Sequence, residues 1–271
     1  MNLFNIESKV ILITGGGGIL GGEMANYLIQ NGATVVILDY QEDIVNNAIT
    51  KLKKKSDNVS GFVCNALDEQ SLKKVSDKII AQYGKIDILI NAAGGNMPGA
   101  TIGEDQTIFD VNIDHFKKVV DLNLFGSILP ALVFGKEMAN NKQGVIINIS
   151  SMTAQSAITR VVGYSASKAA IDNFTKWLSV ELATKFGEGL RVNAIAPGFF
   201  IGNQNRNLLI DQETGNFTER GDTIIRNTPM KRFGETDELN GTIHYLCAEA
   251  SKFVTGVVVP IDGGFSAFSG V

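Results

Sequence analysis

The chain has 271 residues, 44% of them hydrophobic, and a formal net charge of −4. This length allows one large domain with a substantial core, and the acidic balance with no long Lys/Arg block argues against a nucleic-acid partner. The two cysteines and two histidines are scattered, which excludes a disulfide framework and predicts no metal site. No apolar run reaches about 18 residues and no signal-like segment opens the sequence, so we expect a cytoplasmic protein with no membrane span.

Short β-branched runs alternate with helix-length amphipathic segments. Strands are expected at 9–14, 34–39, 59–64, 86–91, 145–150, 191–196 and 257–261, and helices near 20–31, 42–55, 69–83, 114–140, 164–186 and 235–249. Near-continuously apolar strands that alternate with helices are typical of a parallel sheet covered on both faces. We therefore predict one doubly wound α/β domain over 1–271, with seven parallel strands in the order 3-2-1-4-5-6-7.

Two longer segments interrupt this alternation, 94–114 after the fourth strand and 199–234 after the sixth. Loops of that length in a compact domain usually carry function, and loops at the carboxyl ends of parallel strands border the ligand crevice. We expect both segments to be walls of a substrate site, with 199–234 as a substrate-loop insertion.

The first strand leads into a glycine-rich turn, TGGGGILGG at residues 14–22, and then into a helix. Glycines let the backbone approach a pyrophosphate, and the helix N-terminus offers free N–H groups and a positive dipole end. The alternative is a plain tight turn, but the position between strand and helix indicates a dinucleotide (Rossmann) site. The residues predicted to contact the cofactor here are Gly15, Gly17, Gly18, Ile19, Leu20 and Gly21.

The second strand ends at Asp39. A carboxylate at this position accepts hydrogen bonds from the adenosine ribose hydroxyls and repels a 2′-phosphate, and no arginine follows to compensate. The predicted cofactor is therefore NAD rather than NADP, unless Asp39 is only a capping or turn residue.

Ser151, Tyr164 and Lys168 are the predicted catalytic group. Residues four apart share one face of a helix, so the Tyr164 phenol and the Lys168 ammonium are expected to point the same way. A free phenol has a pKa of about 10, and we expect the ammonium, helped by bound nicotinamide, to lower that pKa. The pair would then act as general acid and base between alcohol and ketone, while Ser151, closing the fifth strand, holds the substrate oxygen.

With these motifs, the chain resembles the short-chain dehydrogenase/reductase family over essentially its whole length. Further matches are Asn91-Ala92-Ala93-Gly94, Asn123 and Pro197-Gly198. The resemblance implies that Asn123 is catalytic, holding a proton-relay water near the lysine. It also implies a homotetramer or homodimer, packed through the 164–186 helix and the C-terminal strand. The further cofactor contacts that it implies are Asn65, Ala66, Asn91, Ala92, Ala93, Gly94, Tyr164, Lys168, Pro197, Gly198 and Phe200.

Three positions depart from the family pattern. Ile19 stands where glycine is usual, Asn65 where aspartate is usual, and Gly202 where threonine is usual. We expect a slightly different loop path over the phosphates, an adenine contact through the carbonyl oxygen of Asn65, and one missing contact near the carboxamide. These departures bear on cofactor affinity and leave the type of reaction unchanged.

Within the family, the chain resembles most the D-mannonate oxidoreductase (fructuronate reductase) group, in stretches 91–96, 160–168, 196–207, 228–234 and 262–271. This resemblance implies reduction of the keto group of a hexuronate, namely the conversion of D-fructuronate to D-mannonate with NADH. A sugar acid needs a cation for its carboxylate, and Arg160 could form a bidentate pair with it, although a surface or subunit-contact arginine is an equal alternative. The predicted substrate contacts are Asn96, Ser151, Gln155, Arg160, Tyr164, Gln204, Asn205 and Arg206.

Two other functions stay open. The first is another polyol or keto-acid reductase, such as a gluconate 5-dehydrogenase. The second is a non-catalytic NAD(H)-sensing protein, against which the complete set of Asn123, Ser151, Tyr164 and Lys168 argues, because a sensor has no use for a tuned phenol.

Overall fold

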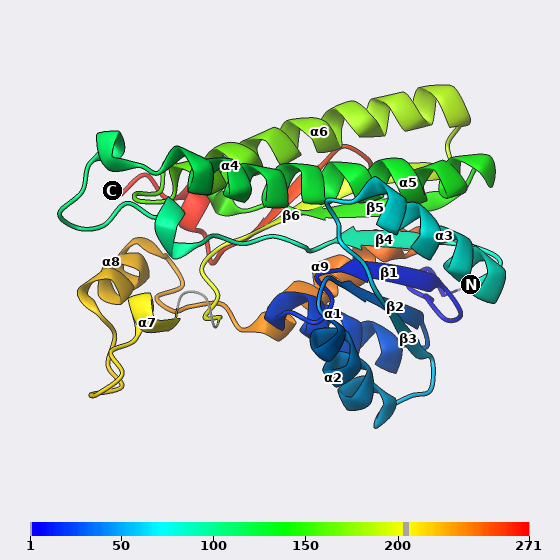
Figure 1. The fold of residues 1–271 in the computed structure, drawn as a ribbon, viewed down its shortest axis with the longest axis horizontal. Coiled ribbons are helices and arrows are strands. Elements are labelled where there is room, and N and C mark those ends of the chain that lie inside the picture. The colour runs from blue at the N-terminus through cyan, green and yellow to red at the C-terminus, as the bar shows by residue number, and fades with distance from the viewer. Residues whose placement is uncertain (1, 203–205, 271) are drawn as a thin grey trace.

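The computed structural model describes residues 2–202 and 206–270. In this part of the chain, a parallel sheet of seven strands runs through the centre in the order β3-β2-β1-β4-β5-β6-β7 (Figure 1). The predicted fold class and strand order are confirmed. The strands are β1 (Val10–Thr14), β2 (Thr34–Asp39), β3 (Val59–Val63), β4 (Ile88–Asn91), β5 (Gly144–Ile149), β6 (Leu190–Pro197) and β7 (Val258–Ile261).

Helices cover both faces of the sheet. The α-helices are α1 (Ile19–Gln30), α2 (Glu42–Lys53), α3 (Glu69–Tyr83), α4 (Ile113–Val120), α5 (Gly126–Asn140), α6 (Val162–Phe186), α7 (Arg206–Leu209), α8 (Glu219–Asn227) and α9 (Asn240–Cys247). The first layer of core packs α1, α2 and α9 against the sheet, and the second packs α3, α5 and α6 against its other face. Successive side chains of a strand point to opposite faces of the sheet, so each buried strand contributes to both layers. In β1, Ile11 and Ile13 belong to the first layer, and Val10 and Leu12 belong to the second.

The helix expected over 114–140 is divided into three parts. α4 and α5 are separated by a π-helical turn, Asp121–Phe125. Inside that turn, the Asn123 side-chain amide donates to the Val119 carbonyl at 2.8 Å, the acceptor that a regular helix offers to the Asn123 backbone N–H. Single π turns of this kind occur mostly at functional sites. The expected helix is therefore present, with a π-helical turn inside it where a side chain competes for the backbone hydrogen bonds.

The 28-residue stretch Ile113–Asn140 is long and apolar enough, by length and composition, to cross a membrane, although the sequence reading did not single it out. In the fold, buried α5 side chains such as Phe134 and Met138 pack with those of β4 and β5 in the second core layer. The stretch therefore packs as a core helix.

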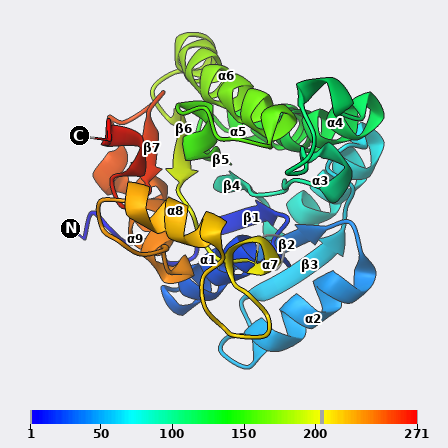
Figure 2. The ribbon, with the colours of Figure 1, turned by 90° about the vertical axis from the view of Figure 1, so that its left-hand side faces the viewer.

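Segment 199–234 has more structure than a loop. It contains α7 and α8, and short bridges join Phe200 to Gly234 and Ile210 to Phe217. Leu209, Ile224 and Phe233 form a small core of their own. Figure 2 shows α7 and α8 at one end of the sheet, in front of the strands. The helix expected over 235–249 is shorter: a 3-10 turn, Thr236–Leu239, leads into α9, which ends at Cys247.

Candidate active site

The candidate site lies where the direction of strand order changes, between β1 and β4. The Ala93 backbone N–H, just after β4, donates to the hydroxyl of Thr14, the last residue of β1, at 3.2 Å. In doubly wound sheets this change of direction opens a crevice at the carboxyl ends of the strands. The predicted glycine turn and the segment 91–94 therefore meet at one place.

The glycine turn has the shape of a phosphate cradle. Gly15 has φ +63°, and a Cβ there would come within 2.8 Å of the Ala93 Cα atom. A Cβ at Gly21 would overlap the Gly15 carbonyl oxygen and come within 3.0 Å of the Gly16 Cα atom. Within the described chain, no side chain caps α1 at Gly18 and its first turn carries no acidic residue. The first N–H groups of α1 are thus available to an anion, which fits the pyrophosphate of a dinucleotide.

Asp39 lies beside this cradle and is 8% exposed. Its carboxylate accepts from the Gly17 N–H at 3.3 Å and from the Tyr40 N–H at 2.9 Å. The carboxylate therefore helps to hold the glycine turn, in addition to the role in ribose recognition that the sequence predicts for it.

Asn65 is exposed at the end of the strand next to Asp39. Its side-chain oxygen accepts from the Leu67 N–H at 3.0 Å. The N–H of the preceding residue, Cys64, donates to the Asp39 carbonyl at 2.7 Å. The oxygen that was expected to meet adenine is thus already accepting one hydrogen bond, because Asn65 forms an Asx turn. The side-chain nitrogen of Asn65 donates no hydrogen bond to any of the described residues.

Tyr164 and Lys168 lie on one face of α6, as predicted. The Lys168 Nζ atom is 5.4 Å from the centroid of the Tyr164 ring, and it donates to the Ile149 carbonyl at 2.7 Å. Lys168 is 3% exposed, whereas Tyr164 is half-buried. Burial lowers the pKa of Lys168 to about 8, an effect that the negative charge of Asp172 opposes.

The pKa of Tyr164 has two local influences. Burial raises the pKa of the phenol, and the hydrogen bond with Ser151 opposes this by lowering it. The sequence predicts a lowering by the Lys168 ammonium together with bound nicotinamide; in this chain without nicotinamide, the ammonium donates to the Ile149 carbonyl and lies over the ring face. A nicotinamide cation is then needed to supply the missing positive charge.

Ser151 lies two residues beyond the end of β5, so it does not close that strand. It caps the 3-10 turn Met152–Ala154, where its hydroxyl accepts from the Thr153 N–H at 3.2 Å. This cap fixes the hydroxyl next to the Tyr164 phenol, whose pKa it lowers. A substrate oxygen placed between the two would meet both hydroxyls.

Asn123 is fully buried and clamps the loop after β4. Its amide nitrogen donates to the Gly95 carbonyl at 2.7 Å, and its oxygen accepts from the Gly95 N–H at 3.0 Å. A Cβ on Gly94 would come within 2.7 Å of the Asn123 oxygen and 3.4 Å of the Lys168 Nζ atom. Asn123 thus lies close to Lys168, with its side chain bound to the loop backbone.

Asn91 supports the sheet from inside. Its amide donates to the Asn148 side-chain oxygen at 2.9 Å, and Asn148 in turn donates to the Thr175 hydroxyl at 2.9 Å. All three are buried, and the pair Asn91 and Asn148 lie opposite each other on β4 and β5. This chain of hydrogen bonds ties β4 and β5 to α6, which carries Tyr164.

The remaining cofactor candidates border the crevice from β6. Gly198 packs against Asp262 so closely that a Cβ would come within 2.6 Å of the Asp262 Cα atom. The Phe200 side chain is buried in the core, and a Cβ on Gly234 would lie 2.6 Å from its ring. Phe200 therefore has its ring committed to packing, so any cofactor contact there would involve its backbone.

The predicted substrate residues do not all come together. Asn96 donates to the Thr101 hydroxyl at 2.8 Å, and its buried oxygen has no partner within the described residues, so it suits a substrate hydroxyl. Gln155 instead lines a cavity of about 650 Å³ with Asp172, Lys176 and residues 256–258. Arg206 begins α7 and is exposed. Gln204 and Asn205 lie outside the described residues.

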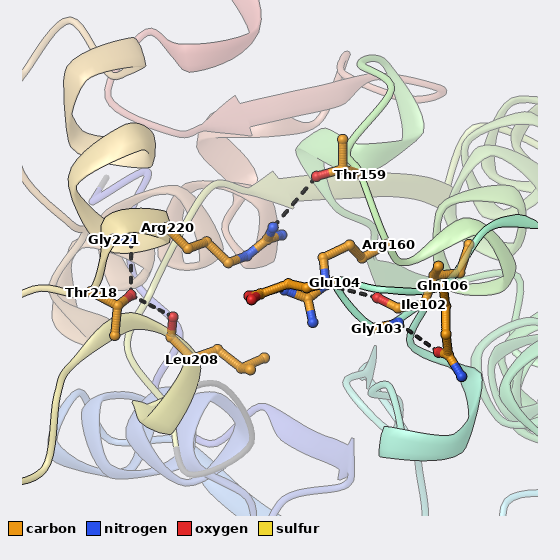
Figure 3. Close-up of polar contacts among 10 residues, drawn as sticks. All are labelled: Ile102, Gly103, Glu104, Gln106, Thr159, Arg160, Leu208, Thr218, Arg220 and Gly221. Carbon is orange, nitrogen blue, oxygen red and sulfur yellow. Dashed lines mark hydrogen bonds and ion pairs between the residues drawn. The ribbon is translucent and has the colours of Figure 1, made fainter.

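Arg160 holds the loop after β4. Its Nε atom donates to the Ile102 carbonyl at 2.7 Å, and its Nη1 atom pairs with Glu104 at 3.2 Å. Figure 3 shows a second arginine, Arg220 of α8, directed toward Arg160 and Thr159. Sequence reasoning did not select Arg220 as a site residue. The sequence showed it only as one of several cationic residues in segment 199–234.

No group of three or more His, Cys, Asp or Glu side chains able to hold a metal was found in the residues that the structure describes.

Comparison with known proteins supports these observations. The family model described as short chain dehydrogenase matches residues 9–213. An uncharacterized oxidoreductase, UxuB of Bacillus subtilis (strain 168), is 44% identical, with 98% of each chain covered. A 2-dehydro-3-deoxy-D-gluconate 5-dehydrogenase of Formosa agariphila is 32% identical over 100% of this chain and 97% of the relative. Among solved structures, a candidate D-mannonate oxidoreductase from Haemophilus influenza with bound NAD has a TM-score of 0.91 and 43% identity, with 98% of each chain covered.

Proposed function

We propose that this chain, which belongs to the short-chain dehydrogenase family, is an NAD-dependent oxidoreductase that acts on the keto or hydroxyl group of a sugar acid. One observation carries the proposal. The Ala93–Gly94 backbone contacts the glycine turn at Gly15 on one side and approaches the Lys168 ammonium on the other. A dinucleotide bound in the cradle would therefore present its reactive end to Tyr164.

The chain's own residues account for proton handling and positioning. In the direction of reduction, the Ser151 and Tyr164 hydroxyls hold the substrate oxygen, and Tyr164 gives its proton to that oxygen as the alcohol forms. Lys168, buried and held by the Ile149 carbonyl, keeps a positive charge close to the phenol ring. NADH, when bound, supplies the hydride to the carbonyl carbon.

The preferred substrate pair is D-fructuronate and D-mannonate. The support is the sequence resemblance to the D-mannonate oxidoreductase group, the 43% identity to the NAD-bound structure, and the polar, cationic residues around the crevice. A gluconate-type 5-dehydrogenase is the second candidate, favoured by the relative from Formosa agariphila. Asp39 beside the glycine turn supports NAD as the cofactor.

The decisive experiment follows NADH oxidation by the purified protein with D-fructuronate, D-tagaturonate, 5-keto-D-gluconate and neutral ketones, each repeated with NADPH. We expect D-fructuronate with NADH to have the highest kcat/KM. Tyr164→Phe is the matched control, because it should lower kcat by about 10²- to 10⁴-fold while NADH still binds. NADH binding without reduction of any carbonyl compound would favour the sensing protein instead.

For the homodimer or homotetramer that the sequence predicts through the 164–186 helix and the C-terminal strand, we propose that the outer face of α6, with α5 beside it, is one contact between copies. Leu132, Trp177 and Val180 are 55%, 61% and 66% exposed there, and exposed apolar residues that lie together can mark a protein contact. Trp177→Glu with Val180→Glu should reduce the mass in analytical ultracentrifugation, whereas Leu3→Glu, at an exposed position near the N-terminus, should not. An unchanged mass would exclude this face.

A further inference from the structure

Three segments distant in sequence converge beside the catalytic helix. The loop after β4 starts at Gly94, close to Lys168, and reaches Ile102, whose N–H donates to the Arg160 carbonyl at 3.0 Å. Arg160 precedes α6, the helix that carries Tyr164. From the opposite side, α8 brings Arg220, whose Nη1 atom donates to the Thr159 hydroxyl at 3.4 Å (Figure 3).

The two arginines bring like charges together. Within the described residues, no carboxylate forms an ion pair with Arg220. The pKa of Arg220 is lowered mainly by burial and further by the positive charge of Arg160. Two guanidinium groups that repel each other at a half-buried place are stabilised by an anion between them.

Both arginines are held in place by the fold. Arg160 has φ +77°, a left-handed conformation that costs a non-glycine residue free energy and is usually found where function requires it. Its backbone and its Nε atom are both bound to Ile102. Arg220 lies in the first turn of α8, which Thr218 caps by accepting from the Gly221 N–H at 3.1 Å, and which Ile224 anchors in the small core.

We propose that Arg160 and Arg220 together bind the carboxylate of the substrate, and that Arg220 is a specificity-determining residue for acids over neutral sugars. This inference rests on the proposed function and names the chemistry of its substrate site. Glu104 is the chain's own carboxylate at this place: it pairs with Arg160 at 3.2 Å while its side chain is 87% exposed. A substrate carboxylate displaces Glu104 from Arg160 and gains Arg220 as a second partner.

The test compares an acid with its uncharged amide. D-mannonate and D-mannonamide are titrated by calorimetry into the NADH-saturated protein, in which neither alcohol can be oxidised, and KM and kcat are measured for D-fructuronate against the neutral ketose D-fructose. We expect the normal protein to prefer each acid, and Arg220→Gln to weaken binding of D-mannonate and raise the KM for D-fructuronate by about 10- to 100-fold. The affinity of Arg220→Gln for D-mannonamide should change by less than about twofold, because the amide has no carboxylate to pair with Arg220. Its kcat for D-fructuronate should also change by less than about twofold.

Arg226→Gln is the matched control, because Arg226 lies on the same helix, is exposed and its guanidinium donates to the Thr223 hydroxyl of its own helix. It should behave as the normal protein. Arg220→Lys should restore part of the preference, and Glu104→Gln should tighten binding of the acid by removing the competing carboxylate. A normal protein that does not prefer the acid, or an Arg220→Gln variant that loses acid and amide equally or neither, overturns the proposal.

The failure of this inference differs from that of the proposed function. If Arg220→Gln reduces D-fructuronate with the same KM as the normal protein, the oxidoreductase assignment stands and the arginine pair does not. If no acid on the panel is reduced but D-mannonate still binds better than its amide and Arg220→Gln abolishes that difference, the carboxylate site stands and the reaction must be sought on another acid.

Discussion

The Lys168 Nζ atom lies over the face of the Tyr164 ring, 5.4 Å from its centroid, because the two residues are one helical turn apart. Its hydrogen bond goes to the Ile149 carbonyl. The ammonium thus lies near the phenol ring, while burial raises the pKa of Tyr164 and the hydrogen bond with Ser151 opposes that rise.

The ionisation of Tyr164 should therefore depend on the cofactor. Near-ultraviolet phenolate absorbance, taken as the difference between the normal protein and Tyr164→Phe, should show a phenol that titrates above pH 10 without cofactor. Saturating NAD⁺ should move the transition to lower pH, because a cation then lies near the phenol. A transition near neutrality in the cofactor-free protein would show that Lys168 is sufficient.

Lys168 should reduce the stability of the free chain at neutral pH. Its pKa is about 8 in the folded chain and near the usual 10.5 in the unfolded chain, a gap equivalent to about 3 kcal/mol. The unfolded chain binds more protons between pH 8 and 10.5, so the free energy of unfolding should rise with pH across this window. Below pH 8 the full cost of the buried charge remains.

Lys168→Met should consequently raise the free energy of unfolding at pH 7 by about 1–2 kcal/mol, after allowing for the lost hydrogen bond to Ile149, while abolishing turnover. Urea denaturation at pH 7 and pH 10 measures this, and the gain should disappear at the higher pH. A variant that is less stable than the normal protein at pH 7 would contradict the buried-charge account.

The glycine cradle predicts opposite outcomes for two neighbouring substitutions. A Cβ at Gly21 would overlap the Gly15 carbonyl, so Gly21→Ala should weaken NADH binding at least about tenfold. A Cβ at Gly22 meets only the Gly16 carbonyl, at an ordinary 3.6 Å, so Gly22→Ala should bind NADH normally. Fluorescence titration with NADH, alongside the melting temperature of each variant, separates a binding defect from misfolding. Equal affinities would remove this turn from the phosphate site.

Asp39 should set the cofactor preference. Asp39→Asn keeps the size of the side chain and an acceptor for the Gly17 N–H, but it removes the charge that repels a 2′-phosphate. The ratio of kcat/KM with NADPH to that with NADH should rise about tenfold or more. Asp39→Ala, which also loses the contact with Gly17, should raise the ratio while lowering both values. An unchanged ratio in both variants would assign Asp39 to turn structure only.

Much of this site was predictable because its signals are local. The apolar runs ended where the strands end at Thr14 and Asp39, and the glycines at the first turn predicted the cradle that the structure shows. The spacing of four between Tyr164 and Lys168 determined a shared helix face. These features depend on residues close in sequence, so backbone geometry alone relates them.

The tertiary structure decided the electrostatics and the pairing of distant segments. The burial of Lys168 beside the Ile149 carbonyl, and the burial of the phenol that raises the pKa of Tyr164, depend on how α6 packs against the sheet. Arg220 approaches Arg160 and donates to Thr159, although these residues lie 60 and 61 positions away in the sequence. No local sequence pattern predicts that these segments come together. Desolvation and long-range proximity are properties of the packed chain, because only folding determines which groups lose water and which charges become neighbours.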